Sequence, residues 1–174
     1  LLMVAITAII SGMAIPTAAV YVTVFLIAIP VVIKLGVSVI AANLFAFYFG
    51  VVSGLTPPVC LVAFAAAGLA GAPMMRTGFE SFKLGLSAYI VPFAFALTPA
   101  LLMDAPFSQI IIRAPIAIVG VIALSIGLIG YSFFGKTKLI ERVLFVSAGI
   151  GALVPWIIVA IISAVVCVIL IVLQ

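Results

Sequence analysis

The chain has 174 residues, of which 69% are hydrophobic and 6% are charged, whereas a soluble domain has about 25% charged residues. Its net charge of +4 comes from basic residues scattered between apolar runs, which argues against a nucleic-acid-binding face. The lack of histidine excludes the H-E-x-x-H zinc motif and histidine-based catalytic triads, so we do not expect an enzyme. Repeated apolar runs of about 18 residues or more predict an all-α integral membrane protein.

The first apolar run, residues 1–35, is interrupted by Gly12–Thr17, which reads G-M-A-I-P-T. Either it is one tilted or kinked membrane helix, or it is a re-entrant hairpin whose tip is Gly12–Thr17. A straight helix of this length would measure more than about 50 Å, whereas the hydrocarbon core is about 30 Å thick, so length favours the hairpin. The chain begins inside this apolar run without a basic segment, so we expect it to be part of a longer protein.

The second run, residues 37–70, contains the segment G-V-V-S-G-L-T-P-P-V-C. Pro57 and Pro58 lack N–H groups, and their rings clash with the preceding helical turn. We therefore expect a helix that stops near Ser53 and restarts near Pro57 or Pro58. Broken backbone at membrane depth is tolerated where it lines a polar cavity, and ion-coupled transporters use such breaks to hold substrate and cation.

Oxygen atoms in the break and at the hairpin tip are the ligands that we expect for Na⁺, which is a hard cation. Neither segment contains a carboxylate, so a nearby anionic substrate would help to stabilise the ion. The helix ends that follow Pro16 and Pro58 would attract its carboxylate. A purely structural kink, with Ser53 as a packing residue, is the alternative. The candidate ion- and substrate-binding residues are Gly12, Ala14, Pro16, Thr17, Ser53, Gly54, Thr56, Pro57 and Pro58, with Na⁺ at Ser53, Gly54 and Thr56.

Residues 73–83 alternate apolar and charged side chains, which predicts an amphipathic helix in the membrane interface, with Arg76 paired to Glu80. We expect membrane spans of a scaffold type over residues 84–134, namely Leu84–Met103 with a kink at Pro92, and Ile110–Phe134.

Residues 135–174 begin with a charged loop, Lys136–Arg142, and continue as an apolar run around Pro155. This run is either a re-entrant pair that breaks at Pro155 or one long helix. The excess of Lys and Arg predicts that one set of basic residues is cytoplasmic. That set comprises Arg76, Lys83, Lys136, Lys138 and Arg142.

Three motifs occur in order: G-M-A-I-P-T-A-A-V-Y-V, A-I-P-V-V-I-K-L-G-V and L-F-A-F-Y-F-G-V-V-S-G-L-T-P-P-V. Together they resemble the large membrane subunit of tripartite ATP-independent periplasmic (TRAP) transporters, and most of all the fused-permease branch that works with TAXI-type binding proteins. The resemblance covers about residues 8–103 and is weaker over the tail. The chain departs from the family at Asn43, where histidine is common.

The resemblance implies the second inverted repeat of an elevator-type transporter, made of a re-entrant hairpin (1–35) and a discontinuous helix (37–70). Residues 1–72 would be half of the transport domain and residues 73–83 the arm that joins it to the scaffold. The implied function is import of a small organic acid with Na⁺ across the cytoplasmic (inner) membrane of a bacterium or archaeon. The implied partners are a periplasmic solute-binding protein, a small membrane subunit and the N-terminal half of the permease, with no cofactor besides the coupling ion. A membrane anchor subunit without transport activity is the alternative.

Overall fold

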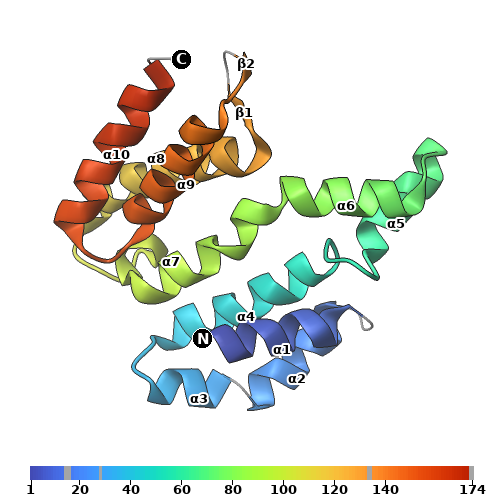
Figure 1. Cartoon of the computed structure of the whole chain (residues 1–174). Coiled ribbons are helices and arrows are strands. Elements are labelled where there is room, and N and C mark those ends of the chain that lie inside the picture. The colour runs from blue at the N-terminus through green and yellow to red at the C-terminus, as the bar shows by residue number, and fades with distance from the viewer. Residues whose placement is uncertain (14–16, 28, 133–134, 173–174) are drawn as a thin grey trace. The chain divides into compact units, whose positions relative to one another are not determined.

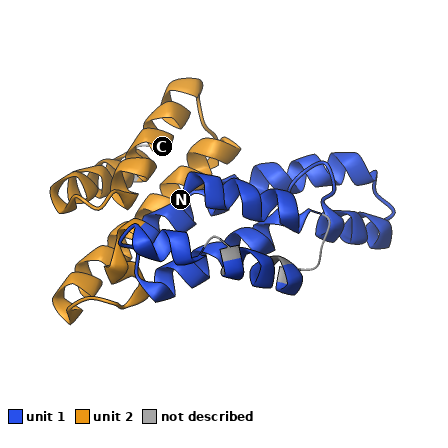
Figure 2. Cartoon of the chain, turned by 90° about the horizontal axis from the view of Figure 1, so that it is seen from below, with its two compact units in different colours: residues 1–96 blue, residues 97–174 orange. Residues whose placement is uncertain are grey.

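The computed structural model describes residues 1–13, 17–27, 29–132 and 135–172. It is helical apart from a two-stranded hairpin, and it divides into two compact units, Leu1–Ala96 and Leu97–Gln174 (Figure 2). By length and composition, one helix in the described part of the chain can cross a bilayer. A bent pair, Met74–Leu84 with Leu86–Leu97, would make a second span if its two helices count together.

Unit 1 begins with four helices, coloured blue to cyan in Figure 1. Helices α1 and α2 lie side by side, contact each other and both pack against α4 (Figure 1). These two helices therefore pack against each other and do not continue one another as a single membrane helix. The helices are α1 (Leu2–Gly12), α2 (Thr17–Ile27), α3 (Ile29–Lys34) and α4 (Val39–Ser53).

The core of unit 1 is built on one face of α4. Phe45 and Phe49 are fully buried there and lie one turn apart, with their rings in an edge-to-face contact. Both rings also meet Phe93 in edge-to-face geometry, at centroid distances of 5.2 and 5.6 Å. Phe45 and Phe49 are thus packing residues that contact α7 (Val91–Leu97), which carries Phe93.

The amphipathic segment forms α6 (Met74–Leu84), which packs against α5 (Leu61–Ala70). The predicted pair between Arg76 and Glu80 is wrong, because Glu80 instead accepts a hydrogen bond from Lys83 at 3.1 Å. An acidic residue that precedes its basic partner on a helix is the better orientation for such a pair, which explains the choice. Both side chains are mostly exposed, so the pair contributes little to stability.

The span with a kink at Pro92 that the sequence predicts over Leu84–Met103 is not one α-helix. The segment is divided into η1 (Leu86–Tyr89), α7 (Val91–Leu97) and η2 (Pro99–Leu102). Pro92, which the sequence predicts as a kink, lies in the first turn of α7, and Pro99 is the first residue of η2. Proline is favoured at these positions, where its missing N–H is not needed.

Unit 2 continues from η2 into the 23-residue helix α8 (Phe107–Ile129), which is the helix long enough to cross a bilayer. A short hairpin of β1 (Tyr131–Ser132) and β2 (Gly135–Lys136) follows. The predicted charged loop is wrong beyond Lys138, because α9 (Leu139–Leu153) already begins at Leu139. Helix α10 (Ile157–Val172) packs against α9, so the run around Pro155 is a pair of helices and not one long helix.

Glycines let α8 and α9 approach each other closely. Gly120 and Gly127 on α8 and Gly149 on α9 are all buried at the contact. A Cβ added at Gly120 would lie 2.7 Å from the Cβ of Ala152, and one added at Gly127 would lie 2.9 Å from the carbonyl oxygen of Arg142. Small residues at such contacts are the usual means by which helices pack within membranes.

We expect Gly149→Ala to lower the melting temperature of the purified protein by about 2–10 °C. The added Cβ would lie 2.8 Å from the backbone nitrogen of Leu124 and 2.9 Å from the carbonyl oxygen of Gly120. Backbone atoms cannot rotate away, so α8 and α9 must separate, at a cost of about 1–3 kcal/mol. Gly68→Ala in α5 is the matched control, because an added Cβ there meets no described atom within 4 Å. Equal melting temperatures for the two variants would contradict the close α8–α9 contact.

Candidate functional site

Helix α4, which precedes the double proline, ends where the sequence predicts. Ser38 caps the start of α4 by accepting a hydrogen bond from the backbone nitrogen of Ala41, and α4 ends at Ser53. The predicted restart of the helix near Pro57 or Pro58 is wrong, because α5 begins at Leu61. Cys60 has a left-handed backbone (φ 40°) and separates the prolines from the new helix. The break therefore comprises residues 54–60, with a cis peptide bond between the two prolines.

The carbonyl groups of the break are largely occupied by its own turns. The oxygen of Val52 accepts two hydrogen bonds, from the nitrogen of Leu55 and the hydroxyl of Thr56, both at 3.0 Å. A carbonyl oxygen has two lone pairs, so that of Val52 has none left for an ion. The oxygens of Ser53 and Gly54 each accept one backbone bond, from Thr56 and Val62, and keep one lone pair.

Gly12 lies directly against Ser53, so the end of the first hairpin helix meets the end of α4. A Cβ added at Gly12 would lie 2.1 Å from Ser53 Oγ and 2.6 Å from its Cβ. Ser53 is 1% exposed and donates a 2.6 Å hydrogen bond to the carbonyl oxygen of Gly50. The structure thus brings together one residue from each of the two segments that the sequence singled out.

Thr56 has a partner that the sequence did not indicate. Its hydroxyl lies 2.6 Å from that of Tyr89, in η1, which is 33 residues away. Thr56 is buried, and Tyr89 also packs edge-to-face against Phe82 of α6. A buried tyrosine hydroxyl in an apolar segment needs a hydrogen-bond partner, so the sequence does predict that Tyr89 has one. The sequence does not reveal which residue that partner is.

The second hairpin helix is attached to α4 through Asn43. Tyr21 of α2 donates a 2.9 Å hydrogen bond to Asn43 Oδ1, and Asn43 Nδ2 donates to the carbonyl oxygen of Val39. The Tyr21 ring also meets Phe47 edge-to-face. Asn43 thus joins the hairpin to the broken helix.

The remaining candidates from the sequence lie elsewhere or outside the described residues. Pro57 and Pro58 line a small apolar hollow whose other walls come from α5, α6 and Cys60. Ala14 and Pro16 lie outside the described residues, and Thr17 is described only as the first residue of α2. Of the nine candidates, Gly12, Ser53, Gly54 and Thr56 form the described part of the site.

Comparison with known proteins adds a single match. The family model described as "Tripartite ATP-independent periplasmic transporter, DctM component" matches residues 1–110, which include both Gly12 and the break. No curated protein and no solved structure matches the chain.

Proposed function

Because the chain belongs to the DctM family, the permease component of tripartite ATP-independent periplasmic transporters, we propose that it imports a small organic acid together with Na⁺. The family consists of membrane transport components and not of enzymes. The observation that carries the proposal is the contact between Gly12 and Ser53. It places the end of α1 against the break in α4, where neutral oxygens gather.

We propose that Na⁺ binds at Ser53, Gly54 and Thr56. The backbone oxygens of Ser53 and Gly54 each keep a lone pair, and the hydroxyls of Ser53 and Thr56 accept as well as donate. All of these ligands are neutral, so the bound ion keeps its full charge. A carboxylate beside it is then favoured, which couples acid binding to Na⁺ binding.

The start of α5 is the proposed neighbour of the substrate carboxylate. Its first residue follows Cys60, which makes no side-chain cap hydrogen bond. Uncapped N–H groups at a helix start attract anions. The nitrogen of Val62 already donates to the carbonyl oxygen of Gly54 at 3.3 Å, so the neighbouring N–H groups are the ones proposed to meet the acid.

The architecture proposed for this region is a re-entrant hairpin beside a discontinuous helix. Helices α1 and α2 have 11 residues each, which gives about 16 Å, or half of the hydrocarbon core. Arms of this length enter a bilayer without crossing it. The proposal assigns them to the second inverted repeat of an elevator-type transporter of the TAXI branch, with α6 as the arm and residues 84–134 as scaffold.

The proposed partners follow from the tripartite character of the family. They are a periplasmic solute-binding protein, a small membrane subunit or its fused equivalent, and the N-terminal half of the permease. The proposed location is the cytoplasmic (inner) membrane.

The test is uptake into proteoliposomes that contain the permease assembled with these partners. We expect a panel of labelled mono- and dicarboxylates to include at least one acid whose uptake requires an inward Na⁺ gradient. Choline chloride replaces NaCl as the control. Uptake that is indifferent to Na⁺ would contradict the coupling, and no uptake of any acid would favour a non-transporting anchor subunit.

A further inference from the structure

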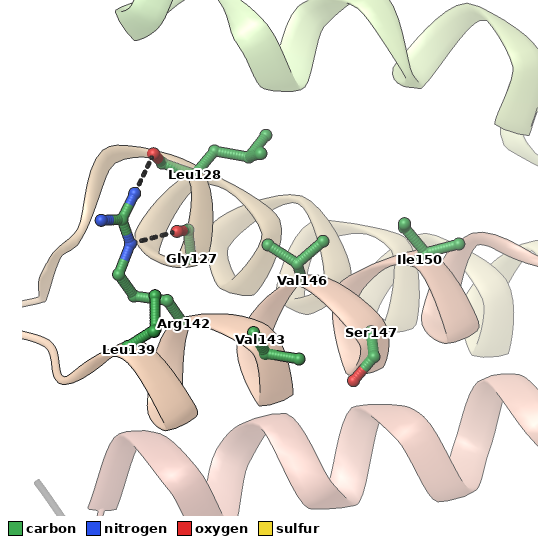
Figure 3. Close-up of a pocket in the computed structure, with 8 residues that line it drawn as sticks. All are labelled: Gly127, Leu128, Leu139, Arg142, Val143, Val146, Ser147 and Ile150. Carbon is green, nitrogen blue, oxygen red and sulfur yellow. Dashed lines mark hydrogen bonds between the residues drawn. The ribbon is translucent and has the colours of Figure 1, made fainter.

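A groove in unit 2 lies outside the part of the chain that the family model matches. It has a volume of about 510 Å³ and runs along α9 beside the end of α8 (Figure 3). Its walls are apolar, and one of its ends is basic. The apolar lining comes mainly from Leu128, Leu139, Val143, Val146 and Ile150.

Arg142 forms the basic end of the groove. Its guanidinium donates hydrogen bonds to the carbonyl oxygens of Gly127 (3.1 Å) and Leu128 (3.0 Å), as Figure 3 shows, and so holds the side chain at the end of α8. A guanidinium has five N–H donors, so donors remain for an anion. The group lies over Gly130, where an added Cβ would be 3.0 Å from its Cζ.

Further positive charge lies on the segment that leads into α9. Lys136 and Lys138 are exposed, and Lys138 is the residue that precedes the groove-lining Leu139. Glu141 is the acidic residue of this segment, and its carboxylate accepts a 2.8 Å hydrogen bond from the backbone nitrogen of Lys138. The groove end therefore has an excess of positive charge.

The location of the groove at the end of α8 indicates how deep in the membrane the groove lies. Helix α8 is long enough to cross the hydrocarbon core, and the basic end of the groove lies where α8 ends. Tyr131, just beyond that end, is 56% exposed, as is common for aromatic residues at headgroup level. The basic end then lies among headgroups, and the apolar walls extend to the depth of acyl chains.

We propose that this groove binds an anionic phospholipid of the surrounding bilayer. One acyl chain lies along Val143, Val146 and Ile150, and the phosphate meets Arg142 and the two lysines. Basic pockets beside membrane helices on the cytoplasmic side attract anionic headgroups, which is also the side that the excess of basic residues predicts. The site does not depend on Na⁺ coupling, since it involves unit 2 alone.

Native mass spectrometry of the purified chain in detergent micelles tests the proposal, with dioleoyl-phosphatidylglycerol and dioleoyl-phosphatidylcholine as probes. We expect phosphatidylglycerol to bind at least tenfold more tightly. The double variant K136Q/K138Q removes two charges and leaves the hydrogen bonds from Arg142 to the end of α8 in place. It should weaken that binding about tenfold or more, since each surface charge contributes about fivefold. Val143→Trp should weaken it similarly by filling the groove from a position that is 62% exposed.

Two matched control variants test whether the effects depend on changing the groove itself. Lys34→Gln removes an exposed charge from α3, and Val165→Trp adds the same bulk at an exposed position on α10, so neither should change lipid affinity. Equal binding of the two lipids, or unchanged phosphatidylglycerol binding in Val143→Trp, would overturn the proposal. A Val143→Trp variant that binds lipid normally but loses a co-purifying membrane subunit would instead assign the groove to a protein helix.

Discussion

We expect Gly12→Ala to abolish Na⁺-dependent uptake and to lower the melting temperature of the purified protein by about 5 °C or more. The new methyl group would overlap Ser53, whose Oγ and Cβ lie 2.1 and 2.6 Å from its position. The hydroxyl is able to rotate away, but the Cβ is attached to a helix end and is not. The variant must therefore separate α1 from α4 at the site. Uptake and thermal unfolding measure the two effects.

A second-site change distinguishes this overlap from a general loss of folding. Ser53→Gly removes both contacting atoms, so the double variant G12A/S53G should regain most of the lost melting temperature. Ser53→Ala removes the hydroxyl but keeps the Cβ, and should restore less. If Ser53→Gly fails to restore stability to Gly12→Ala, the two residues do not meet as described.

We expect Thr56→Val to raise the Na⁺ concentration needed for half-maximal thermal stabilisation by about tenfold or more. A bound ion stabilises the folded state in proportion to its affinity, so melting curves in NaCl and in choline chloride report that affinity without a known substrate. Valine keeps the shape of threonine and removes one proposed oxygen ligand. It also removes the hydrogen bonds to the carbonyl oxygen of Val52 and to the hydroxyl of Tyr89.

Tyr89→Phe is the matched control for that loss. It breaks the same 2.6 Å contact but leaves the Thr56 hydroxyl in place. If Thr56 binds the ion, Thr56→Val weakens Na⁺ binding and Tyr89→Phe does not. Equal loss in both variants would assign the effect to the hydrogen bond, and no loss in either would show that Thr56 is structural.

The two hydroxyls of the site face different neighbours within unit 1. Ser53 lies against Gly12 of α1, whereas Thr56 meets Tyr89 of η1, which follows the amphipathic helix α6. Any movement of the break relative to α1 or η1 must therefore disturb one of these contacts. The compact unit extends to Ala96, so α6, η1 and most of α7 belong to the same unit as the hairpin.

Local properties of the chain were enough to predict its membrane class, the end of α4 at Ser53 and the amphipathic helix α6. Composition, the missing N–H groups of proline and helical periodicity each act within a few residues. The same local reasoning misplaced the start of α5, because no short pattern revealed the left-handed backbone at Cys60. It also treated Pro92 as a kink, although Pro92 lies in the first turn of a new helix.

The contacts that form the candidate site could be seen only in the tertiary structure. The approach of Gly12 to Ser53 and the hydrogen bond between Thr56 and Tyr89 both join residues far apart in the chain. Such contacts depend on how whole helices pack. A sequence so uniformly apolar offers many equivalent faces for that packing, so its pattern does not select one.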